Sequence, residues 1–311
     1  MRTMALLLER PGKLSVSPVA LNPPAAGDVV VDVDVTGVST GTERLLWAGE
    51  MPPFPGLGYP LVPGYEAVGR VVEAHGEVEP RIGQRVFVPG ASCYRDVKGL
   101  FGGSAAKLVV PARRAVAIGR LPDAEATLLA LAATARHAIA GGTAPDLVVG
   151  HGVLGRLLAR IAIASGAPAP IVWERESSRR SGGIGYAVVD PADDDRRDYR
   201  SIYDASGDAG LVDGLVRRLA PGGEIVLAGF YKAPISFAFP PAFMREARLR
   251  VAAEWKPADM ATVLDLVAAG RLSLADLVTD REPAARADEA CRTAFGDPDC
   301  LKMILDWRDT R

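Results

Sequence analysis

Short apolar runs separated by glycine and proline dominate residues 1–122. Valine-rich runs stand at residues 29–35, 67–73, 85–89 and 106–111. Runs of β-branched residues bounded by such breakers predict strands, and several short strands in succession are typical of a barrel or sandwich. We therefore predict a β-rich domain over residues 1–122.

The pattern becomes helical over the Ala- and Leu-rich segment 123–141 and then alternates between strand and helix. Strands are predicted at residues 147–149, 171–173, 187–189, 202–203, 224–230 and 249–253, with helices after the first strand and over 209–219. This alternation predicts an α/β domain, a doubly wound parallel sheet that binds its ligand at the carboxyl ends of the strands. We place it at residues 123–255. The tail, 256–311, with a helix at 260–269 and an apolar run at 300–305, is assigned to the first domain.

A glycine-rich turn joins strand 147–149 to a helix. Gly150, Gly152 and Gly155 follow the spacing G-x-G-x-x-G. In such a turn the first glycine bends the chain, the second admits a pyrophosphate and the third lets helix pack on strand. The free N–H groups of the helix then favour phosphate. Glu174 ends the next strand about 20 residues later, where a carboxylate can hydrogen-bond the adenosine ribose.

The pattern thus predicts dinucleotide binding. The candidate cofactor contacts are Gly150, His151, Gly152, Val153, Leu154, Gly155, Glu174, Ser206 and Gly229. Because a 2′-phosphate beside Glu174 would bring like charges together, the expected cofactor is NAD. Arg175, Arg179 and Arg180 follow closely and can hold a phosphate, so NADP stays open as an alternative.

Charge and cysteine content narrow the class of protein. Lys plus Arg number 36 and Asp plus Glu 38, giving a net charge of -2, so no nucleic-acid partner is expected. The sequence contains neither an apolar run of about 18 residues nor a signal-peptide pattern, so no transmembrane segment and a cytoplasmic location are expected. The 3 cysteines are too few and too scattered for a disulfide framework or a four-cysteine zinc site.

The order of a β-rich domain, a helix, a dinucleotide-binding sheet and a returning tail resembles the medium-chain dehydrogenase/reductase superfamily over the whole chain. T-G-V-S-T-G-T-E at 36–43 stands where zinc enzymes of that superfamily carry G-x-C, and V-P-G-Y-E at 62–66 stands where they carry G-H-E. The resemblance implies a GroES-like barrel beside a Rossmann sheet, and a possible homodimer formed through the cofactor domains.

The zinc ligands of that superfamily are replaced here. Ser39 and Tyr65 occupy two of the ligand positions, no cysteine falls near residues 131–134, and only Glu66 survives. Hydroxyl groups are not the ligands zinc uses in proteins, so no catalytic zinc is expected. A protein group must then take the hydroxyl proton. The candidates are Ser39, Thr40, Thr42, Glu43, Tyr65, Glu66 and His137, each of which could instead serve packing, an ion pair or a helix surface.

More closely, the stretches GVSTGTE, MPPFPGLGYPLVPGYEA, ALAATARHA, SFAFPPAFMREARLR and CLKMILDW resemble the zinc-free dehydrogenases of bacteriochlorophyll a biosynthesis. This resemblance implies oxidation of the 3-(1-hydroxyethyl) group of a bacteriochlorophyllide to acetyl, with hydride passing to NAD. Two alternatives stay open: a zinc-free NAD(P)H quinone or enone reductase, and a non-catalytic tetrapyrrole-binding protein. The proline-rich loop 51–64 and the aromatic residues between 230 and 244 could wall a macrocycle, or pack within their own domain or a dimer.

Overall fold

The computed structural model describes residues 1–310, which form two compact units. The first comprises Met1–Ala130 and the segment from Leu277 onward, and the second comprises Leu131–Asp276. These units differ from the predicted boundaries after residues 122 and 255 chiefly in helix α7 (Pro257–Ala268), which lies in the second unit. Asp259 of α7 lies 2.8 Å from Nδ1 of His137, which fastens α7 to α3 (Leu129–Ala140).

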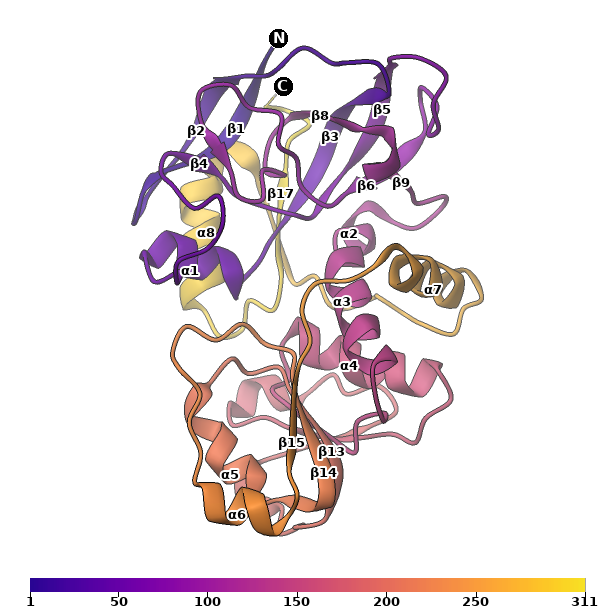
Figure 1. Cartoon of the computed structure of the whole chain (residues 1–311). Coiled ribbons are helices and arrows are strands. Elements are labelled where there is room, and N and C mark those ends of the chain that lie inside the picture. The colour runs from indigo at the N-terminus through magenta and orange to yellow at the C-terminus, as the bar shows by residue number, and fades with distance from the viewer. Residues whose placement is uncertain (311) are drawn as a thin grey trace. The chain divides into compact units, whose positions relative to one another are not determined.

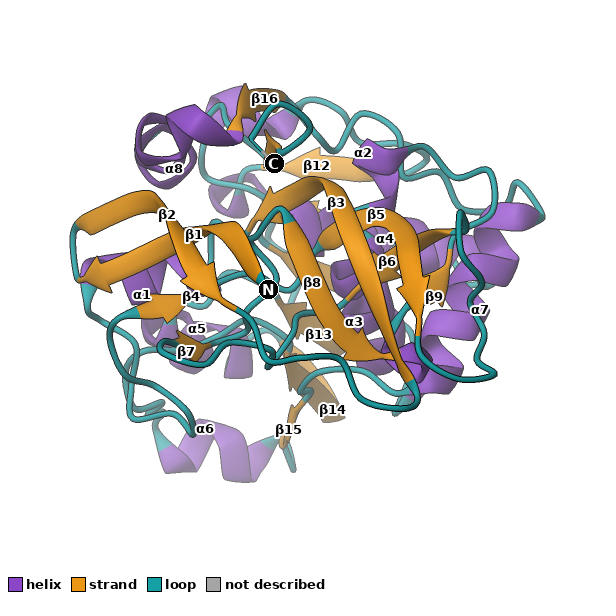
Figure 2. Cartoon of the chain, turned by 90° about the horizontal axis from the view of Figure 1, so that it is seen from above, coloured by secondary structure: helices purple, strands orange, loops and turns teal. Residues whose placement is uncertain are grey.

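The first unit is β-rich, as predicted, and contains two sheets. One has the order β16-β17-β3-β5-β6-β9, with β8 paired to β3, and the other has the order β2-β1-β4-β7. Figure 2 shows β8, β3 and β5 side by side. The strands are β1 (Arg2–Arg10), β2 (Lys13–Ala20), β3 (Asp28–Val38), β4 (Leu61–Val62), β5 (Ala67–Ala74), β6 (Arg85–Val88), β7 (Lys98–Gly99), β8 (Lys107–Pro111), β9 (Val116–Ala117), β16 (Asp280–Pro283) and β17 (Met303–Asp306).

The tail returns to this unit through β17, which pairs antiparallel with β3 so that Ile304 faces Gly37. Helix α8 (Ala287–Gly296) precedes it and buries Ala287, Ala290 and Cys291 in the same apolar core. Because β17 runs beside the end of β3, it brings Lys302 close to Gly37 of β3 and to Glu66, the residue that precedes β5. Helices α1 (Thr42–Ala48) and α2 (Asp123–Ala126) complete the unit.

The proline-rich loop packs within its own unit. Phe54, Leu57 and Tyr59 lie against an apolar cluster that includes Leu8, Leu46 and other buried side chains. The Tyr59 hydroxyl also donates to the Leu46 carbonyl over 2.7 Å. Of the two roles predicted for this loop, the structure confirms packing against its own domain.

The second unit holds a parallel sheet with the order β12-β11-β10-β13-β14-β15, which confirms the predicted doubly wound fold. Figure 1 shows α5 and α6 lying beside β14 and β15. Further elements of this unit are β10 (Leu147–Val149), α4 (Val153–Ala164), β11 (Ile171–Trp173), β12 (Ala187–Val189), β13 (Tyr199–Asp204), α5 (Val212–Val216), β14 (Leu219–Leu227), α6 (Phe239–Met244) and β15 (Arg248–Val251).

Two predicted helices differ from those observed. The helix expected over 123–141 is interrupted between α2 and α3, and that expected over 209–219 ends at Val216. Strand β14 begins already at Leu219 and runs through Pro221 and the following glycines, where a turn was expected. These residues form an irregularity in the pairing of β14 with β13. Leu219 pairs with Tyr199, but the next pair is Glu224 with Ser201, so the register shifts between them.

Candidate active site

The hydroxyl groups of Ser39 and Tyr65 form a hydrogen bond beside the segment that joins β3 to α1. Tyr65 Oη donates to Ser39 Oγ over 2.8 Å, and Thr42 N–H donates to the same oxygen over 3.4 Å. The Tyr65 ring is fixed edge-on against Phe101, with ring centroids 5.4 Å apart. Burial and the neighbouring Glu66 carboxylate raise the pKa of Tyr65 well above its ordinary value of 10. Tyr65 therefore stays neutral, and the two hydroxyls can exchange donor and acceptor roles.

Two buried carboxyl groups and one lysine lie beside this pair. Glu43 and Glu66 are 4% and 1% exposed, and Lys302, which is 1% exposed, forms an ion pair with Glu66 Oε2. Glu43 Oε2 accepts the Ser39 N–H over 2.8 Å, while burial and the Glu66 charge raise the pKa of Glu43 to about 8. Burial also raises the pKa of Glu66, against the opposing effect of Lys302. With one cation for two acids, we infer that Glu43 is the neutral one at neutral pH.

The backbone leaves room for this ion pair at Gly37. Gly37 N–H donates to the Glu66 carbonyl over 2.9 Å, which places β3 directly against the Glu66 backbone. A Cβ at residue 37 would stand 2.1 Å from Glu66 Oε2. Lys302 was not among the predicted site residues. Its signal in the sequence is a lone charge within the apolar run 300–305, which demands a buried partner.

The structure therefore brings together Ser39, Thr42, Glu43, Tyr65 and Glu66 in the first unit, and Thr40 lies in the same turn. His137 belongs to the second unit, where its Nδ1 is occupied by Asp259 Oδ2. That oxygen also accepts the Lys256 N–H over 2.9 Å at the start of α7. The observed contact of His137 is thus one that joins α3 to α7.

The glycine turn has the geometry expected for phosphate binding. Gly150 adopts φ +96°, a left-handed conformation that favours glycine, and its N–H donates to the Trp173 carbonyl over 2.9 Å. A Cβ at Gly155 would stand 1.8 Å from the Gly150 oxygen, so this glycine lets α4 approach β10. At Gly152 no atom lies within 4 Å of the Cβ position. Val153 and Leu154 open helix α4, whose first N–H groups have no partner within the helix.

Three turns converge at the carboxyl ends of β10, β13 and β14. A Cβ at Gly150 would lie 3.4 Å from the Ser206 backbone, and one at Gly229 would lie 2.8 Å from Gly207 N. Asp204 Oδ1 accepts both the N–H and the hydroxyl of Ser206, over 2.8 and 2.6 Å. Gly229 N–H donates to the Asp204 carbonyl over 2.9 Å. The predicted residues Gly150, Ser206 and Gly229 therefore line one edge of the sheet.

Glu174 and Arg180 close a loop after β11. Glu174 Oε2 accepts the His151 N–H over 3.0 Å, and its Oε1 accepts the Glu176 N–H over 2.9 Å. Arg180 donates to the Glu174 carbonyl over 2.9 Å and pairs with Asp190, so its charge is already used within the loop. The carboxylate keeps lone pairs for a ribose hydroxyl.

The ring of His151 is buried and both its nitrogens are used. Nδ1 lies 2.7 Å from the Arg179 carbonyl, and Nε2 lies 3.0 Å from the Tyr186 hydroxyl. One neutral tautomer satisfies both bonds, with Nδ1 donating and Nε2 accepting. The side chain of His151 thus joins the turn to the following loop, and only its backbone faces the glycines.

The two glycines of the turn allow a separation of folding from binding. Gly155→Ala is expected to lower the free energy of unfolding by about 1–3 kcal/mol or more, because the new methyl meets a backbone oxygen. The methyl group added by Gly152→Ala meets no protein atom, so the free energy of unfolding should stay unchanged. Because the methyl occupies the space assigned to the pyrophosphate, the Kd of this variant for NAD should rise about tenfold. Urea unfolding and a fluorescence titration with NAD check both. A Gly152→Ala protein that bound NAD as tightly as wild type would contradict this assignment.

The buried His151 ring predicts a pH dependence of stability. Burial, aided by Arg156, lowers the pKa of His151 from 6.5 to about 4. Between these values the unfolded chain binds a proton here and the folded chain does not, so the free energy of unfolding falls as the pH drops from about 6.5 to about 4. The contribution is about 3 kcal/mol. Urea unfolding over this range should show a flatter curve for His151→Gln; parallel curves would exclude the effect.

Comparison with known proteins shows which family and which individual enzymes this chain is similar to. Residues 25–122 match the family described as "Alcohol dehydrogenase GroES-like domain". The chain is 59% identical to the 2-desacetyl-2-hydroxyethyl bacteriochlorophyllide A dehydrogenase of Cereibacter sphaeroides and 55% identical to that of Rhodobacter capsulatus, each over 100% of both chains.

Solved structures agree on the fold. An alcohol dehydrogenase from Escherichia coli, solved with NADH, matches with a TM-score of 0.84 at 22% identity, covering 98% of this chain and 99% of that one. L-idonate 5-dehydrogenase from Escherichia coli matches with a TM-score of 0.86 at 17% identity over 98% of both chains. The predicted GroES-like domain and Rossmann sheet are thereby confirmed. The chain belongs to the bacteriochlorophyllide a dehydrogenase family of the medium-chain dehydrogenase/reductase superfamily, oxidoreductases that act on CH–OH groups.

Proposed function

We propose that this enzyme oxidises the 3-(1-hydroxyethyl) group of a bacteriochlorophyllide to an acetyl group, with NAD as hydride acceptor. The observation that carries the proposal is the identity of 59% and 55%, over the full chain, to two enzymes named for this substrate. Two features of the structure support this chemistry. The hydroxyl groups of Tyr65 and Ser39 can hydrogen-bond an alcohol oxygen, and the glycine turn can accommodate a dinucleotide.

The residues around the glycine turn fit NAD. The open space at Gly152 and the free N–H groups of α4 suit a pyrophosphate, and Glu174 presents its carboxylate at the end of β11. NAD is favoured over NADP because Glu174 would repel a 2′-phosphate and Arg180 is already paired with Asp190. When bound, the nicotinamide accepts the hydride. The residues that we propose to hold the dinucleotide are Gly150, Gly152, Val153, Leu154, Gly155, Glu174, Ser206, Gly229 and the backbone of His151.

A catalytic zinc ion does not fit the first unit. At the superfamily's ligand positions the chain offers the hydroxyls of Ser39 and Tyr65, and the carboxylate of Glu66 is taken up by Lys302. Residues 1–310 hold no group of three or more His, Cys, Asp or Glu side chains placed to bind a metal ion. We therefore propose zinc-free catalysis, which full activity after extensive chelation would support.

The proton of the substrate hydroxyl leaves through Tyr65 and Ser39 in this proposal. Tyr65 is neutral, so it can accept the substrate proton only as it passes its own proton to Ser39 Oγ. Ser39 in turn releases its own proton to solvent water while the hydride passes from the carbon to NAD, so the alcohol loses one proton and one hydride, and the products are the ketone, NADH and a solvent proton. Glu43 is a poorer base near neutral pH, since its pKa of about 8 keeps it protonated.

The deciding experiment mixes the purified protein with NAD and 3-(1-hydroxyethyl) bacteriochlorophyllide a, and follows the NADH absorbance band and the pigment band together. One NADH per acetyl product is the expected result. Pigment binding without NADH would favour a carrier protein, and turnover of quinones or enones with NADPH alone would favour a reductase. Faster turnover with NADP than with NAD would overturn the choice of cofactor.

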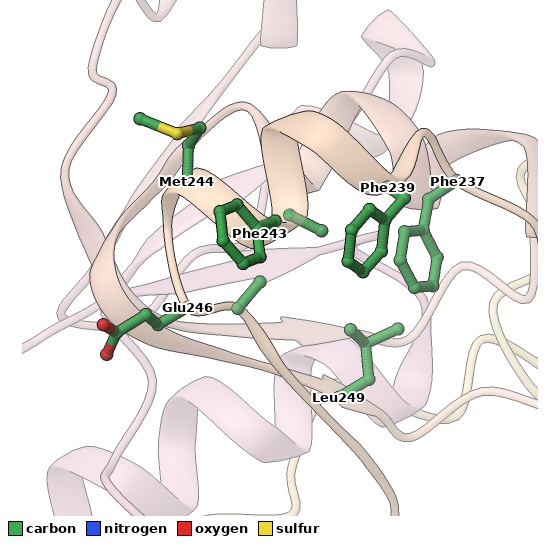
Figure 3. A pocket seen from close by; sticks show the side chains of 8 residues that line it. Phe237, Phe239, Phe243, Met244, Glu246 and Leu249 are labelled. Carbon is green, nitrogen blue, oxygen red and sulfur yellow. The ribbon is translucent and has the colours of Figure 1, made fainter.

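We further propose that the second unit forms a homodimer through β15 and α6. Strand β15 is an edge strand of the parallel sheet, and beside it lies an apolar hollow of about 500 Å³ (Figure 3). The rings of Phe237, Phe239 and Phe243 and the side chain of Leu249 face this hollow in Figure 3. Phe239 and Phe243 are 69% and 65% exposed, an unusual state for large apolar side chains. Sedimentation equilibrium should give twice the chain mass, and Phe243→Glu should give the monomer.

No helix among residues 1–310 has both the length and the apolar character needed to cross a bilayer.

A further inference from the structure

A buried arginine ties the glycine turn to the loop that follows β11. Arg156 lies on α4 and is 7% exposed. Its Nε donates to the His151 carbonyl over 3.0 Å, within the turn. Its other nitrogens donate to the carbonyls of Gly182, Arg179 and Ser181, over 3.2, 3.2 and 3.0 Å. One side chain thus satisfies four backbone carbonyls, one in the turn and three in the loop.

The loop is shaped to receive this guanidinium. Gly182 adopts φ +80°, and a Cβ there would stand 2.4 Å from one Arg156 nitrogen. The Arg179 carbonyl accepts from both Arg156 and the His151 ring. Hydrogen bonds from a charged donor are about twice as strong as neutral ones, so this contact fixes the course of residues 179–182.

The loop held in this way is continuous with the proposed ribose contact. Glu174 begins it, and the Glu174 carboxylate accepts the N–H of His151, whose carbonyl accepts Arg156. Arg180 closes the loop by donating to the Glu174 carbonyl. Because Arg180 lies within residues 179–182 and donates to the Glu174 carbonyl, a shift of this segment also shifts the backbone that orients the Glu174 carboxylate.

We propose that Arg156 is a positioning residue for the adenosine-ribose end of the dinucleotide. It acts through the loop and sets the place of Glu174 relative to the glycine turn, without touching the cofactor. The inference rests on the proposed function, because it requires that a dinucleotide binds at this turn. It adds a residue that the glycine spacing does not include.

Lysine cannot replace this side chain. Arginine offers five N–H donors in a planar fork, whereas lysine offers one compact ammonium group that cannot reach four separated carbonyls. Arg156→Lys should therefore raise the KM for NAD and the Kd for ADP-ribose by about tenfold, with kcat at saturating NAD within about twofold of wild type. The Kd for nicotinamide mononucleotide should not change, since that fragment lacks the adenosine ribose.

Arg160 provides a matched control. It lies one turn along the same helix and is 6% exposed, but it donates to the carbonyls of Ser273 and Ala275 and reaches the loop only at the Tyr186 side chain, not at the carbonyls of residues 179–182. Arg160→Lys should leave the KM for NAD and the Kd for ADP-ribose unchanged. Amide hydrogen exchange without cofactor gives a second measurement: exchange in residues 174–186 should accelerate in Arg156→Lys and not in Arg160→Lys.

The outcomes separate this inference from the proposed function. If wild type bound no NAD, the proposed function and the positioning role would both be wrong. If wild type bound NAD and Arg156→Lys bound ADP-ribose equally well, only the positioning role would be overturned. Equal losses for ADP-ribose and nicotinamide mononucleotide would also overturn it, since they would indicate general damage to the fold.

Discussion

Tyr65→Phe is expected to lower kcat for the hydroxyethyl pigment by about 10² to 10⁴-fold, the usual contribution of a positioned acid–base group. The substitution removes the hydroxyl that donates to Ser39 and keeps the ring that packs edge-on against Phe101. The KM for NAD should not change, because the glycine turn lies on other elements. Steady-state kinetics with saturating NAD measure the loss.

Tyr59→Phe is the matched control for this prediction. The Tyr59 hydroxyl belongs to the same unit but donates to the Leu46 backbone carbonyl, so its removal should cost stability and leave kcat within about twofold. Ser39→Ala should also lower kcat, and the double variant with Tyr65→Phe should lose little more, because the two hydroxyls act as one relay. A Tyr65→Phe enzyme with wild-type kcat would remove Tyr65 from the mechanism.

The elements that the sequence predicted well are those with a local pattern. The runs at 147–149 and 171–173 are short, wholly apolar and bounded by a polar residue, glycine or proline at each end, and a buried strand is the element that fits this pattern. Helix α8 was not predicted because its buried face is made of alanines and Cys291, too weak a contrast with its charged residues. The hairpin of β1 and β2 was also missed, although the apolar stretch MALLL at 4–8 marks it.

The residues of the candidate site likewise divide into those that a local sequence pattern reveals and those that it does not. Gly150, Gly155 and Glu174 could be found from spacing, because each serves a turn or strand end within one short segment. Lys302 shows in the sequence only as a lone charge in an apolar run, and its partner could not be predicted, since Glu66 lies 236 residues away. Arg156 looks like an ordinary residue of α4 until the loop folds back onto it. Long-range polar contacts leave almost no pattern in a single sequence. Here such contacts form the Lys302–Glu66 ion pair of the first unit and fix the loop at residues 179–182 of the second.

Lys302→Met is expected to lower the free energy of unfolding by about 3–5 kcal/mol, the usual cost of removing one partner from a buried ion pair. Glu66 would be left 1% exposed with no cation and with Glu43 as its neighbour, and it could then be accommodated only by taking up a proton. Urea unfolding at pH 8 measures the effect. There the carboxylate is hardest to protonate, so the loss should be larger than at pH 5.

The double variant Lys302→Met with Glu66→Gln tests whether the loss comes from the orphaned charge. Because the amide carries no charge, the double variant should recover most of the stability, whereas simple loss of lysine packing would not be reversed. Lys13→Met is the control: Lys13 pairs with Glu9 at the surface, where it is 53% exposed, so the change should be below about 1 kcal/mol. If the double variant were no more stable than Lys302→Met alone, the buried ion pair would not be what stabilises this centre. Recovery of stability with a lower kcat would instead indicate that the charge of Glu66 also serves the neighbouring hydroxyl pair.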